Sequence, residues 1–511
     1  MIVSHPCTHR DEFCIPKENE SNISRRVHCG AILKEEYQEA MKKTIAIVLS
    51  LVLALATLAA CAPAPAAVET ATEAPATEAA TEAPAATEAA AAGDKVINIY
   101  TFTDEVPKML DKYIATHPDF GYTINATIIA TTDGLYQPAL DQALAAGGKD
   151  APDMYCAESA FVLKYTQGDM SSYAAKYADL GIDVAAETKA ADIAQYTIDI
   201  GTRPSDSALV GLGYQATGGA FIYRRSLAID TWGTDDPAVI KDKIGPGWDK
   251  FFAAAAELKA KGYGIVSGDG DIWHAVENSS PTGWIVDGKL NIDPARESFL
   301  DLSMKLKEGG YYNDTRDWQD AWFADMQGIG AQPIFGFFGP AWLINYVMAG
   351  HSGGEKAGEG TYGDWAVCEP PVGFFWGGTW VLANKDSSKL EAVGKLIDWI
   401  TLQTCDDSLE YMWANGTLNG EGGTKDTVAS GTVMAKSDGK LDFLGGQNMF
   451  DVFVPANQFA NGKNLTQYDE TINNLWRDQV RQYTAGNIDR DGALAAFKQA
   501  VLDTLGIEAA E

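Results

Sequence analysis

The chain has 511 residues, with 70 acidic side chains against 39 Lys and Arg, so its formal net charge at pH 7 is −31. This acidity makes nucleic acid a poor partner and fits a soluble protein that works outside the cytoplasm. A folded region of this length is too large for one hydrophobic core and suits two lobes.

The N-terminal part of the chain contains an export signal. MKK (41–43) precedes the apolar run TIAIVLSLVLALATLAA (44–60), which is shorter than the roughly twenty residues that span a bilayer. We therefore interpret residues 41–60 as a signal peptide in preference to a transmembrane anchor. Residues 1–40 stand in front of this signal, where they serve no purpose, and we interpret them as the product of a wrongly chosen start codon.

The signal is followed by a lipidation motif and a spacer. LAAC (58–61) resembles the lipobox of bacterial lipoproteins, and the resemblance implies cleavage before Cys61 and attachment of lipid to its sulfur. Residues 61–93 contain no aromatic residue and repeat Thr-Glu-Ala, so they cannot bury enough surface to offset their ordering entropy. We interpret them as a disordered tether that holds a folded domain away from a membrane.

The cysteines and histidines after Cys61 give no sign of a disulfide framework or a metal site. An odd number of cysteines in an exported chain argues against disulfides. The histidines lie far apart and lack the spacing of metal ligands. We expect no metal and no other cofactor. These residues are Cys156, Cys368, Cys405, His117, His274 and His351.

The first part of the folded region alternates strands and helices. KVINIYTF (95–102) is a β-rich run, and the helical spacing of EVPKMLDKYIATHPDFG (105–121) ends before Pro118. YTINATIIA (122–130) and APDMYCA (151–157) are further strands, each followed by a helical segment. The order βαβαβα predicts a parallel sheet with helices on its faces, and ligands bind such sheets beyond the carboxyl ends of the strands.

The pattern changes in the second part of the chain. Residues 206–225 are strand-like, then glycine-rich, then strand-like again, which predicts the first crossing into a second lobe. Residues 364–385 predict a strand, a turn and another strand. Helices are predicted at 247–262, 297–310, 389–403 and 491–506, and the first two of these are amphipathic. We assign residues 94–205 and 385–440 to lobe 1, and residues 206–384 and 441–508 to lobe 2.

The order of these segments resembles the family 1 extracellular solute-binding proteins of ABC importers, the group that includes maltose-binding protein. The resemblance covers about residues 95–505 and is carried by NIYTFTDEVPKML, APDMYCAESAFVLKYTQGD, GYQATGGAFIYRRSL, GWDKFFAAAAELKAKG, GPAWLINYV and PPVGFFWGGTWVLANK. It implies an α/β fold of the periplasmic-binding-protein type, with two lobes, a hinge of crossing segments and a cleft between the lobes. It also implies that the protein captures a carbohydrate and delivers it to the permease subunits of an ABC transporter.

Aromatic residues are the first candidates for ligand contact. A neutral sugar has apolar C–H faces that match aromatic rings, and hydroxyl groups that carboxylates and amides hold by charge-assisted hydrogen bonds. The resemblance places Trp273, Trp342 and Trp376 near the cleft, although ordinary core packing would explain each of them equally well. In packing roles we instead expect Trp318, Trp322 and Trp380.

Polar candidates follow the predicted strands. Asp104 and Glu105 come after the first strand, where the family often places a ligand-binding acid, although either can also cap the next helix. Glu158 follows the third strand, and Gln215 lies at the first crossing. Maltose-binding protein is richer in aromatic residues around Glu158, whereas this chain has Ala157 there, which argues against a maltose-like ligand.

Two adjacent glycines, Gly377 and Gly378, are also candidates. Glycine allows a positive φ or a close approach of the backbone to another group. In the family a glycine pair at this place lines the cleft near a crossing. A tight turn between two strands explains the pair equally well.

Other functions have weaker support in the sequence. Asp104 and Glu158 would suit the acid pair of a glycosidase, but no hydrolase, P-loop or zinc-peptidase motif is present. NIDRDGALAAFK (487–498) begins like a calcium loop but ends on Lys498, where such loops require a glutamate, so a helix N-cap fits better. We expect a monomeric binding protein without enzymatic activity, anchored outside the membrane by lipid. A binder of a polyamine or peptide, and a tethered ligand sensor, are the alternatives.

Overall fold

The computed structural model of the chain describes residues 95–131, 134–420 and 422–510. The predicted extension (1–40), signal peptide (41–60), lipidated Cys61 and tether (61–93) lie outside the described residues. Within the described ranges, none of the helices has the length and apolar character needed to cross a membrane.

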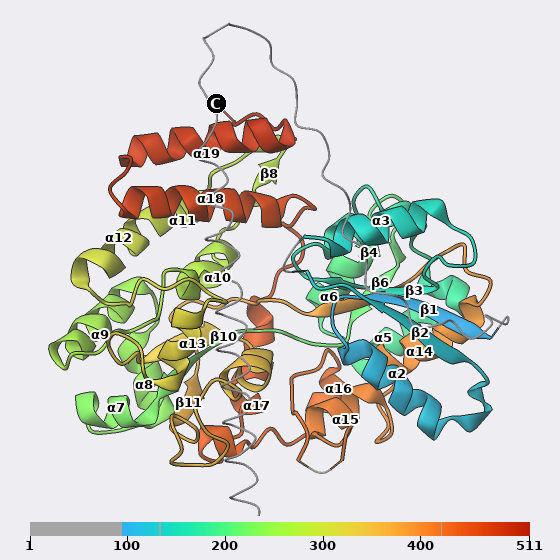
Figure 1. Cartoon of the computed structure of the whole chain (residues 1–511), viewed down its shortest axis with the longest axis horizontal. Helices are drawn as coiled ribbons and strands as arrows, with labels where there is room; N and C mark the ends of the chain where they lie inside the picture. The colour runs from blue at the N-terminus through green and yellow to red at the C-terminus, as the bar shows by residue number, and fades with distance from the viewer. Residues whose placement is uncertain (1–94, 132–133, 421, 511) are drawn as a thin grey trace, which may run out of the picture. The chain divides into compact units, whose positions relative to one another are not determined.

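Lobe 1 is built on a five-stranded sheet. Its strands, in spatial order, are β2 (Thr123–Ile128), β1 (Val96–Thr101), β3 (Met154–Glu158), β12 (Thr379–Ala383) and β6 (Gly211–Gly213). β1 pairs in parallel with β2 and β3, as the alternation of strands and helices predicts, whereas β12 runs antiparallel between β3 and β6. The helices around this sheet are α2 (Glu105–Thr116), α3 (Tyr136–Ala146), α5 (Val184–Ala191), α6 (Gln195–Gly201) and α14 (Leu390–Thr401) (Figure 1).

The burial patterns of β1 and β3 show which faces of each strand are covered. Alternate residues of β1 are buried, including Ile97 and Ile99, as expected for a strand with one face on the core. In β3 every residue except the last, Glu158, is buried, as expected for a strand covered on both faces. The carboxyl ends of β1 and β3 therefore lie at one edge of the sheet, and Glu158 lies there as the first residue that solvent reaches.

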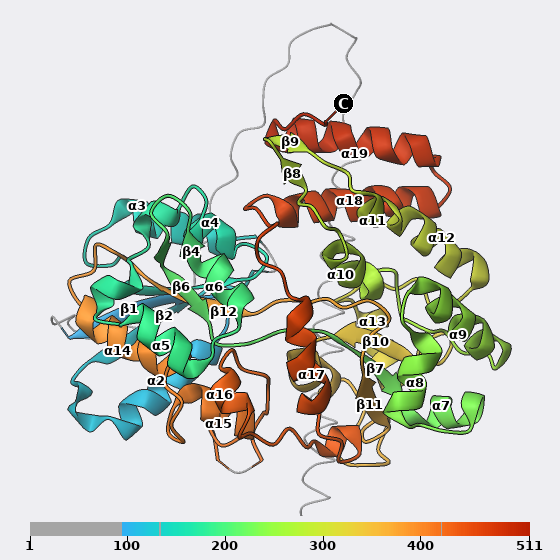
Figure 2. The same ribbon diagram turned by 180° about the vertical axis from the view of Figure 1, so that it is seen from behind.

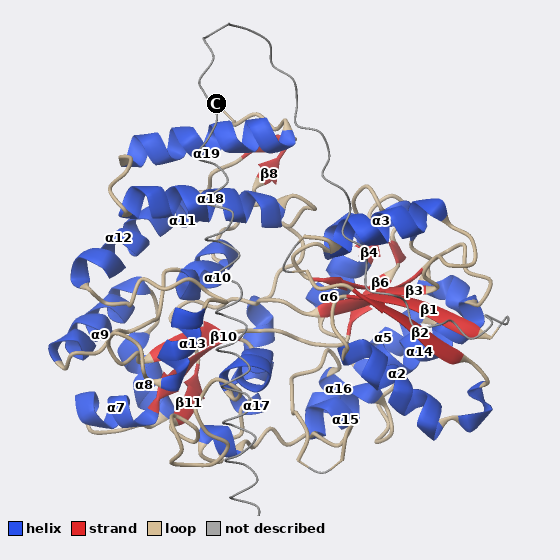
Figure 3. Ribbon diagram, viewed as in Figure 1, coloured by secondary structure: helices blue, strands red, loops and turns tan. Residues whose placement is uncertain are grey.

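Lobe 2 contains a three-stranded antiparallel sheet in the order β10 (Gly336–Gly339), β7 (Ala220–Arg224) and β11 (Trp365–Cys368). Its core is aromatic: the ring of Phe221 lies 5.1–6.3 Å, centroid to centroid, from the rings of Phe251, Phe335 and Phe338. Figure 3 shows this sheet among the helices of the second lobe. These helices are α7 (Arg225–Trp232), α8 (Pro237–Ile244), α9 (Trp248–Ala260), α10 (Gly270–Asn278), α11 (Pro294–Glu297), α12 (Phe299–Gly309), α13 (Asp320–Gln327), α18 (Asp469–Thr484) and α19 (Arg490–Leu505).

The four helices predicted at 247–262, 297–310, 389–403 and 491–506 are present as α9, α12, α14 and α19, each within two residues of the predicted ends. α19 begins after Asp489, whose carboxylate accepts a hydrogen bond of 2.7 Å from the backbone N–H of Gly492. The segment that begins like a calcium loop is therefore a capped helix start. Smaller elements complete the fold: β4 (Thr202–Arg203), β5 (Ala208–Leu209), β8 (Ile285–Val286), β9 (Lys289–Leu290), α4 (Val162–Thr166), α15 (Leu409–Asn415), α16 (Gly431–Met434) and α17 (Phe450–Ala456).

The boundary between the lobes differs from the sequence-based assignment. Residues 206–384 were expected in lobe 2, yet β6 and β12 lie within this range and pair in the sheet of lobe 1. The chain leaves lobe 1 after β6 and returns to it at β12, so lobe 1 extends to about residue 213 and resumes at about 379. α17 lies between the two sheets in both views (Figure 1, Figure 2).

Candidate ligand-binding site

Two segments that cross between the lobes run side by side. We call residues 214–219 and 374–378 the crossing segments; they meet in an antiparallel bridge between Gly218 and Phe375. The backbone N–H of Gly219 donates to the Phe374 carbonyl over 2.8 Å, and that of Trp376 donates to the Thr217 carbonyl over 3.1 Å. These bonds hold the start of the second segment, and with it the Trp376 side chain, against the first.

The glycine pair of the second segment has a demanding conformation. Gly377 has φ +78° and Gly378 has φ +114°, both in the region that side chains other than glycine avoid. The carbonyl of Gly377 accepts a hydrogen bond of 2.9 Å from the Thr217 hydroxyl, and that of Gly378 accepts one of 3.0 Å from the N–H of Ser159. A Cβ at Gly377 would lie 3.1 Å from the indole nitrogen of Trp342. The pair thus joins β12 of lobe 1 to a tryptophan of lobe 2.

Three tryptophans gather beside this glycine pair. The indole N–H of Trp342 donates to the Trp376 carbonyl over 3.0 Å, and the two rings meet edge to face with centroids 4.8 Å apart. Trp318 lies parallel to Trp342 at 6.2 Å and edge-on to Trp376 at 6.2 Å. Trp342 and Trp376 are half-buried and Trp318 is 45% exposed, so solvent reaches all three rings. We call Trp318, Trp342 and Trp376 the tryptophan cluster.

A histidine backs the cluster on the lobe 2 side. The His274 ring stacks on Trp376 with centroids 4.5 Å apart and an interplanar angle of 23°. Its Nδ1 lies 3.3 Å from the Glu277 carboxylate, which also accepts a hydrogen bond of 2.6 Å from the amide of Asn473. Although burial would raise the pKa of Glu277, its contacts with His274 and Asn473 bring that pKa below its ordinary value. This network fixes the ring on which Trp376 rests.

Two carboxylates, one from each lobe, lie close enough to interact through their charges. Glu158 ends β3, opposite Thr379 in the sheet, and accepts a hydrogen bond of 2.7 Å from the Ala160 N–H. Burial raises the pKa of Glu158 to about 7, and the negative charge of Glu470 on α18 adds to the rise. Desolvation raises the pKa of Glu470 as well. Glu158 is therefore held in a partly desolvated setting, where hydrogen bonds from a ligand would be strong, whereas Glu470 is exposed.

The remaining polar residues predicted for the site, two acids and a glutamine, lie outside the tryptophan cluster. Glu105 accepts a hydrogen bond from the hydroxyl of Tyr214, and Gln215 is buried with its amide donating to Asp426 over 2.9 Å. Desolvation raises the pKa of Glu105, and raises that of Asp426 to about 7. Asp104 is exposed and forms an ion pair of 2.7 Å with Lys108 one turn along α2. Glu105 and Gln215 thus belong to a network at the start of the first crossing segment, and Asp104 is exposed.

The structure thus brings together only some of the predicted residues. Glu158, Trp342, Trp376, Gly377 and Gly378 surround one place where the lobes meet. Trp273 is 1% exposed and packs against Phe299 in the core of lobe 2, with ring centroids 4.8 Å apart, so we leave it out of the site. Of the tryptophans expected in packing roles, Trp322 and Trp380 are buried but Trp318 is not. The residues added by the structure are Trp318, His274 and Glu470.

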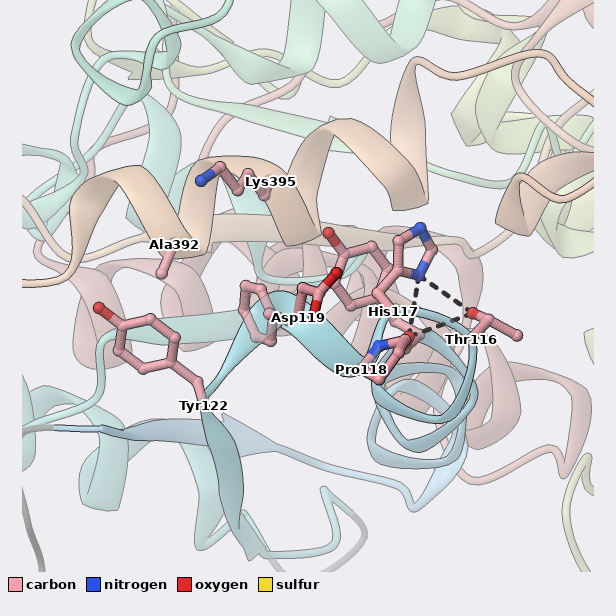
Figure 4. Close-up of a pocket in the computed structure, with 9 residues that line it drawn as sticks. Thr116, His117, Pro118, Asp119, Tyr122, Ala392 and Lys395 are labelled. Carbon is pink, nitrogen blue, oxygen red and sulfur yellow. Dashed lines mark hydrogen bonds between the residues drawn. The ribbon is translucent and has the colours of Figure 1, made fainter.

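A cavity of about 320 Å3 lies elsewhere on lobe 1, where the end of α2 faces α14 (Figure 4). Its walls include Tyr113, His117, Tyr122 and Lys395, and none of the predicted ligand residues lines it. Because this cavity draws on one lobe only, we place the candidate site at the tryptophan cluster. Across the part of the chain that the structure describes, no group of three or more His, Cys, Asp or Glu side chains is arranged to hold a metal ion.

Comparison with known proteins identifies the family. Residues 101–403, more than half of the chain, match the family described as bacterial extracellular solute-binding protein. The chain belongs to this family. It is therefore a solute-binding protein of a family that works outside the cytoplasm. A search of curated proteins gives no match.

Solved structures show the same two-lobed fold. A family 1 extracellular solute-binding protein superposes with a TM-score of 0.62 at 20% identity, covering 80% of this chain and 99% of its own. The galacto-N-biose-/lacto-N-biose I-binding protein of an ABC transporter from Bifidobacterium longum, in complex with lacto-N-biose, gives 0.61 at 16% identity, covering 82% and 100%. An ABC-transporter-associated binding protein from B. animalis subsp. lactis Bl-04, in complex with β-1,6-galactobiose, gives 0.55 at 19% identity, covering 82% and 100%. At these identities the likeness establishes the fold alone.

Proposed function

We propose that the chain captures a carbohydrate between its two lobes and delivers it to an ABC importer. The observation that carries the proposal is the tryptophan cluster, whose solvent-accessible rings gather at the crossing segments between the lobes. Indole rings match the apolar faces of a sugar, and carboxylates accept hydrogen bonds from its hydroxyls. The sugar complexes of the two Bifidobacterium proteins of the same fold support this choice of ligand.

The geometry also supports a mechanism of closure. Trp342 and Glu470 belong to lobe 2, whereas Glu158 belongs to lobe 1, and the crossing segments connect the two. A sugar that contacts both lobes binds the closed arrangement more tightly than an open one, so binding shifts the population toward closure. The permease would then read the closed arrangement by touching both lobes. The sugar leaves chemically unchanged, because the chain acts as a carrier.

A polyamine is the second candidate ligand. The negative charges of Glu158 and Glu470, close enough to raise the pKa of Glu158, would attract a cation, and tryptophan rings hold both methylenes and ammonium groups. The hydroxyls of a sugar are favoured because burial raises the pKa of Glu158 to about 7, so this group is not fully charged near neutral pH. A protonated carboxyl donates to a hydroxyl oxygen but offers little to a cation.

A thermal-shift screen of the purified protein separates these ligands. The panel contains neutral mono- and oligosaccharides, spermidine and short peptides, and a ligand that binds the folded state raises the melting temperature. We expect a shift with at least one neutral sugar. A shift with spermidine and with none of the sugars would replace the carbohydrate by a polyamine.

We also propose that the protein is held at the membrane by lipid on Cys61, reached through the tether of residues 61–93. The proposal rests on the lipobox-like LAAC motif behind an apolar run and on the extracytoplasmic role of the family. Mass spectrometry of the protein from membranes should find Cys61 as a lipidated N-terminus. An N-terminal peptide from residues 1–40 would contradict both the lipid anchor and the assignment of Met41 as the start.

A further inference from the structure

Trp318 has an unusual backbone for a bulky residue. Its φ is +66°, in the left-handed region that an aromatic side chain rarely adopts, and its ring is 45% exposed. Such a conformation is unfavourable for a residue other than glycine and persists only where the surroundings impose it. Since almost half of the ring is in solvent, burial of the ring is a weak reason for the strain. We therefore attribute the positive φ to the contacts of the residues that precede Trp318.

The residue before Trp318 is tied to a distant helix. Oδ1 of Asp317 lies 2.5 Å from Nη2 of Arg477 on α18, and both side chains are largely buried. Burial alone would raise the pKa of Asp317, but the Arg477 guanidinium keeps it below its ordinary value. The start of α10 closes over the pair: a Cβ at Gly270 would lie 2.4 Å from Oδ1 of Asp317. The ion pair is therefore formed, charged and enclosed.

A second anchor holds the segment two residues earlier. The Thr315 hydroxyl lies 2.5 Å from the Ser267 hydroxyl, and the Thr315 N–H donates to the Ser267 carbonyl over 3.3 Å. With Thr315 and Asp317 both fixed and α13 beginning at Asp320, the backbone has little freedom at Trp318. This restriction aims the Trp318 ring at Trp342, whose plane it parallels within 10°.

We propose that Asp317 and Arg477 are positioning residues that hold Trp318 beside Trp342 as a stacking surface for a second sugar ring. The inference rests on the proposed function and makes it more specific: the ligand is an oligosaccharide of at least two rings. The ring planes of Trp342 and Trp318 are parallel within 10° with centroids 6.2 Å apart, and this pair supplies one stacking ring for each of two successive sugar rings. A monosaccharide stacks on one of these rings and leaves the other free.

The first test needs no ligand. Protein labelled with 5-fluorotryptophan gives one ¹⁹F resonance per tryptophan, and W318F assigns that of Trp318. We expect D317N to shift or broaden the Trp318 resonance and to leave that of Trp399, buried in lobe 1, in place. R477K, which keeps the charge, should have a smaller effect than R477Q.

The matched control is D364N, which breaks the similarly buried pair of Arg224 and Asp364, 2.7 Å apart. A Trp318 resonance unchanged by D317N, or changed equally by D364N, would overturn the positioning role.

The second test uses glucose and galactose oligomers of one, two and three rings in calorimetric titrations. We expect W318A to weaken binding of two- and three-ring sugars about tenfold more than it weakens binding of one-ring sugars. D317N should cause a similar loss, and should cause no further loss in a W318A background, because it acts through Trp318. An undiminished effect of D317N without Trp318, or equal losses for all sugar lengths, would overturn the inference. If the wild-type protein bound no sugar, the proposed function would fail, while the fluorine spectra would still decide the positioning role.

Discussion

Trp342 and Trp376 carry most of the expected contact with ligand. We predict that W342A and W376A each weaken sugar binding at least about tenfold, since aromatic anchors in the centre of a site dominate binding energy. The fold should survive, because both rings are only half-buried. The control is W232A, which removes a half-buried tryptophan whose indole N–H bonds Glu257 on the outer part of lobe 2. Equal affinities of all three variants and the wild type in calorimetry would remove both residues from the site.

Gly377 allows a second prediction about a single residue. G377A places a side chain at φ +78° and a Cβ 3.1 Å from the indole nitrogen of Trp342. G233A is its matched control, because Gly233 has φ +76° but its Cβ would meet nothing within 4 Å. Both variants should lose about 1–2 kcal/mol of stability in urea denaturation, from backbone strain. Only G377A should lose sugar affinity, because it also displaces Trp342. A loss of affinity in G233A of the same size would show that strain alone is responsible.

The sequence located part of this site and missed part of it for identifiable reasons. Glu158 and the glycine pair were predicted because they follow strands or sit at a crossing. Trp273 and His274 are neighbours on α10, about 100° apart around the helix, and the sequence alone does not say which of them faces the ligand. Trp318 belongs to an irregular segment whose conformation depends on Arg477, far along the chain. No local pattern reports such a contact.

At the scale of elements, the crossing segments require close packing. A Cβ at Gly219 would lie 2.1 Å from the ring of Phe374. We predict that G219A destabilises the protein by about 1–3 kcal/mol through overpacking. F374A creates a cavity and is also destabilising, but it removes the clash. The double variant should therefore be more stable than the sum of the two losses predicts, as measured by urea denaturation. Strict additivity would mean that the two crossing segments are not packed as described.

The sequence predicted which segments form strands better than it predicted which strands pair with each other. The strand character of residues 379–383 was expected from their apolar run, but their place in the sheet of lobe 1 was not. Local side chains determine whether a segment is extended, whereas its pairing depends on the whole chain. β12 lies between β3 and β6 in the sheet of lobe 1, so the chain returns to this lobe at about residue 379, earlier than the boundary at residue 385 that the residue pattern indicated.

At the scale of the whole molecule, stability should depend on pH through buried carboxyl groups. Desolvation raises the pKa values of Glu158, Asp271, Asp426 and Asp469 to about 7. In the unfolded chain these groups lose their protons near pH 4, so between about pH 4 and 7 the folded state binds more protons. The free energy of unfolding should therefore fall as pH rises through this range and change little above it. Urea denaturation at pH 5, 6, 7 and 8 measures this change in the free energy of unfolding.

A variant isolates the contribution of the candidate site to this dependence. E158Q removes one of the four titrating groups while keeping its shape, so its stability should fall less steeply with pH than that of the wild type. D271N removes another of these carboxyl groups, in lobe 2, and its comparison with the wild type tests whether a buried carboxyl group other than Glu158 contributes to the pH dependence in the same way. A wild-type stability that rises from pH 5 to pH 8 would contradict the protonated state of these carboxyl groups.

The most direct test of carbohydrate capture is calorimetric titration of the purified protein with the neutral sugar that gives the largest thermal shift, followed by chromatography of the recovered sugar. We predict saturable binding of one sugar per chain, lost in W342A and W376A, with the sugar recovered unchanged. Binding that tolerates the loss of both tryptophans, or a sugar that is cleaved during the titration, would contradict a carrier whose two lobes hold carbohydrate at the tryptophan cluster.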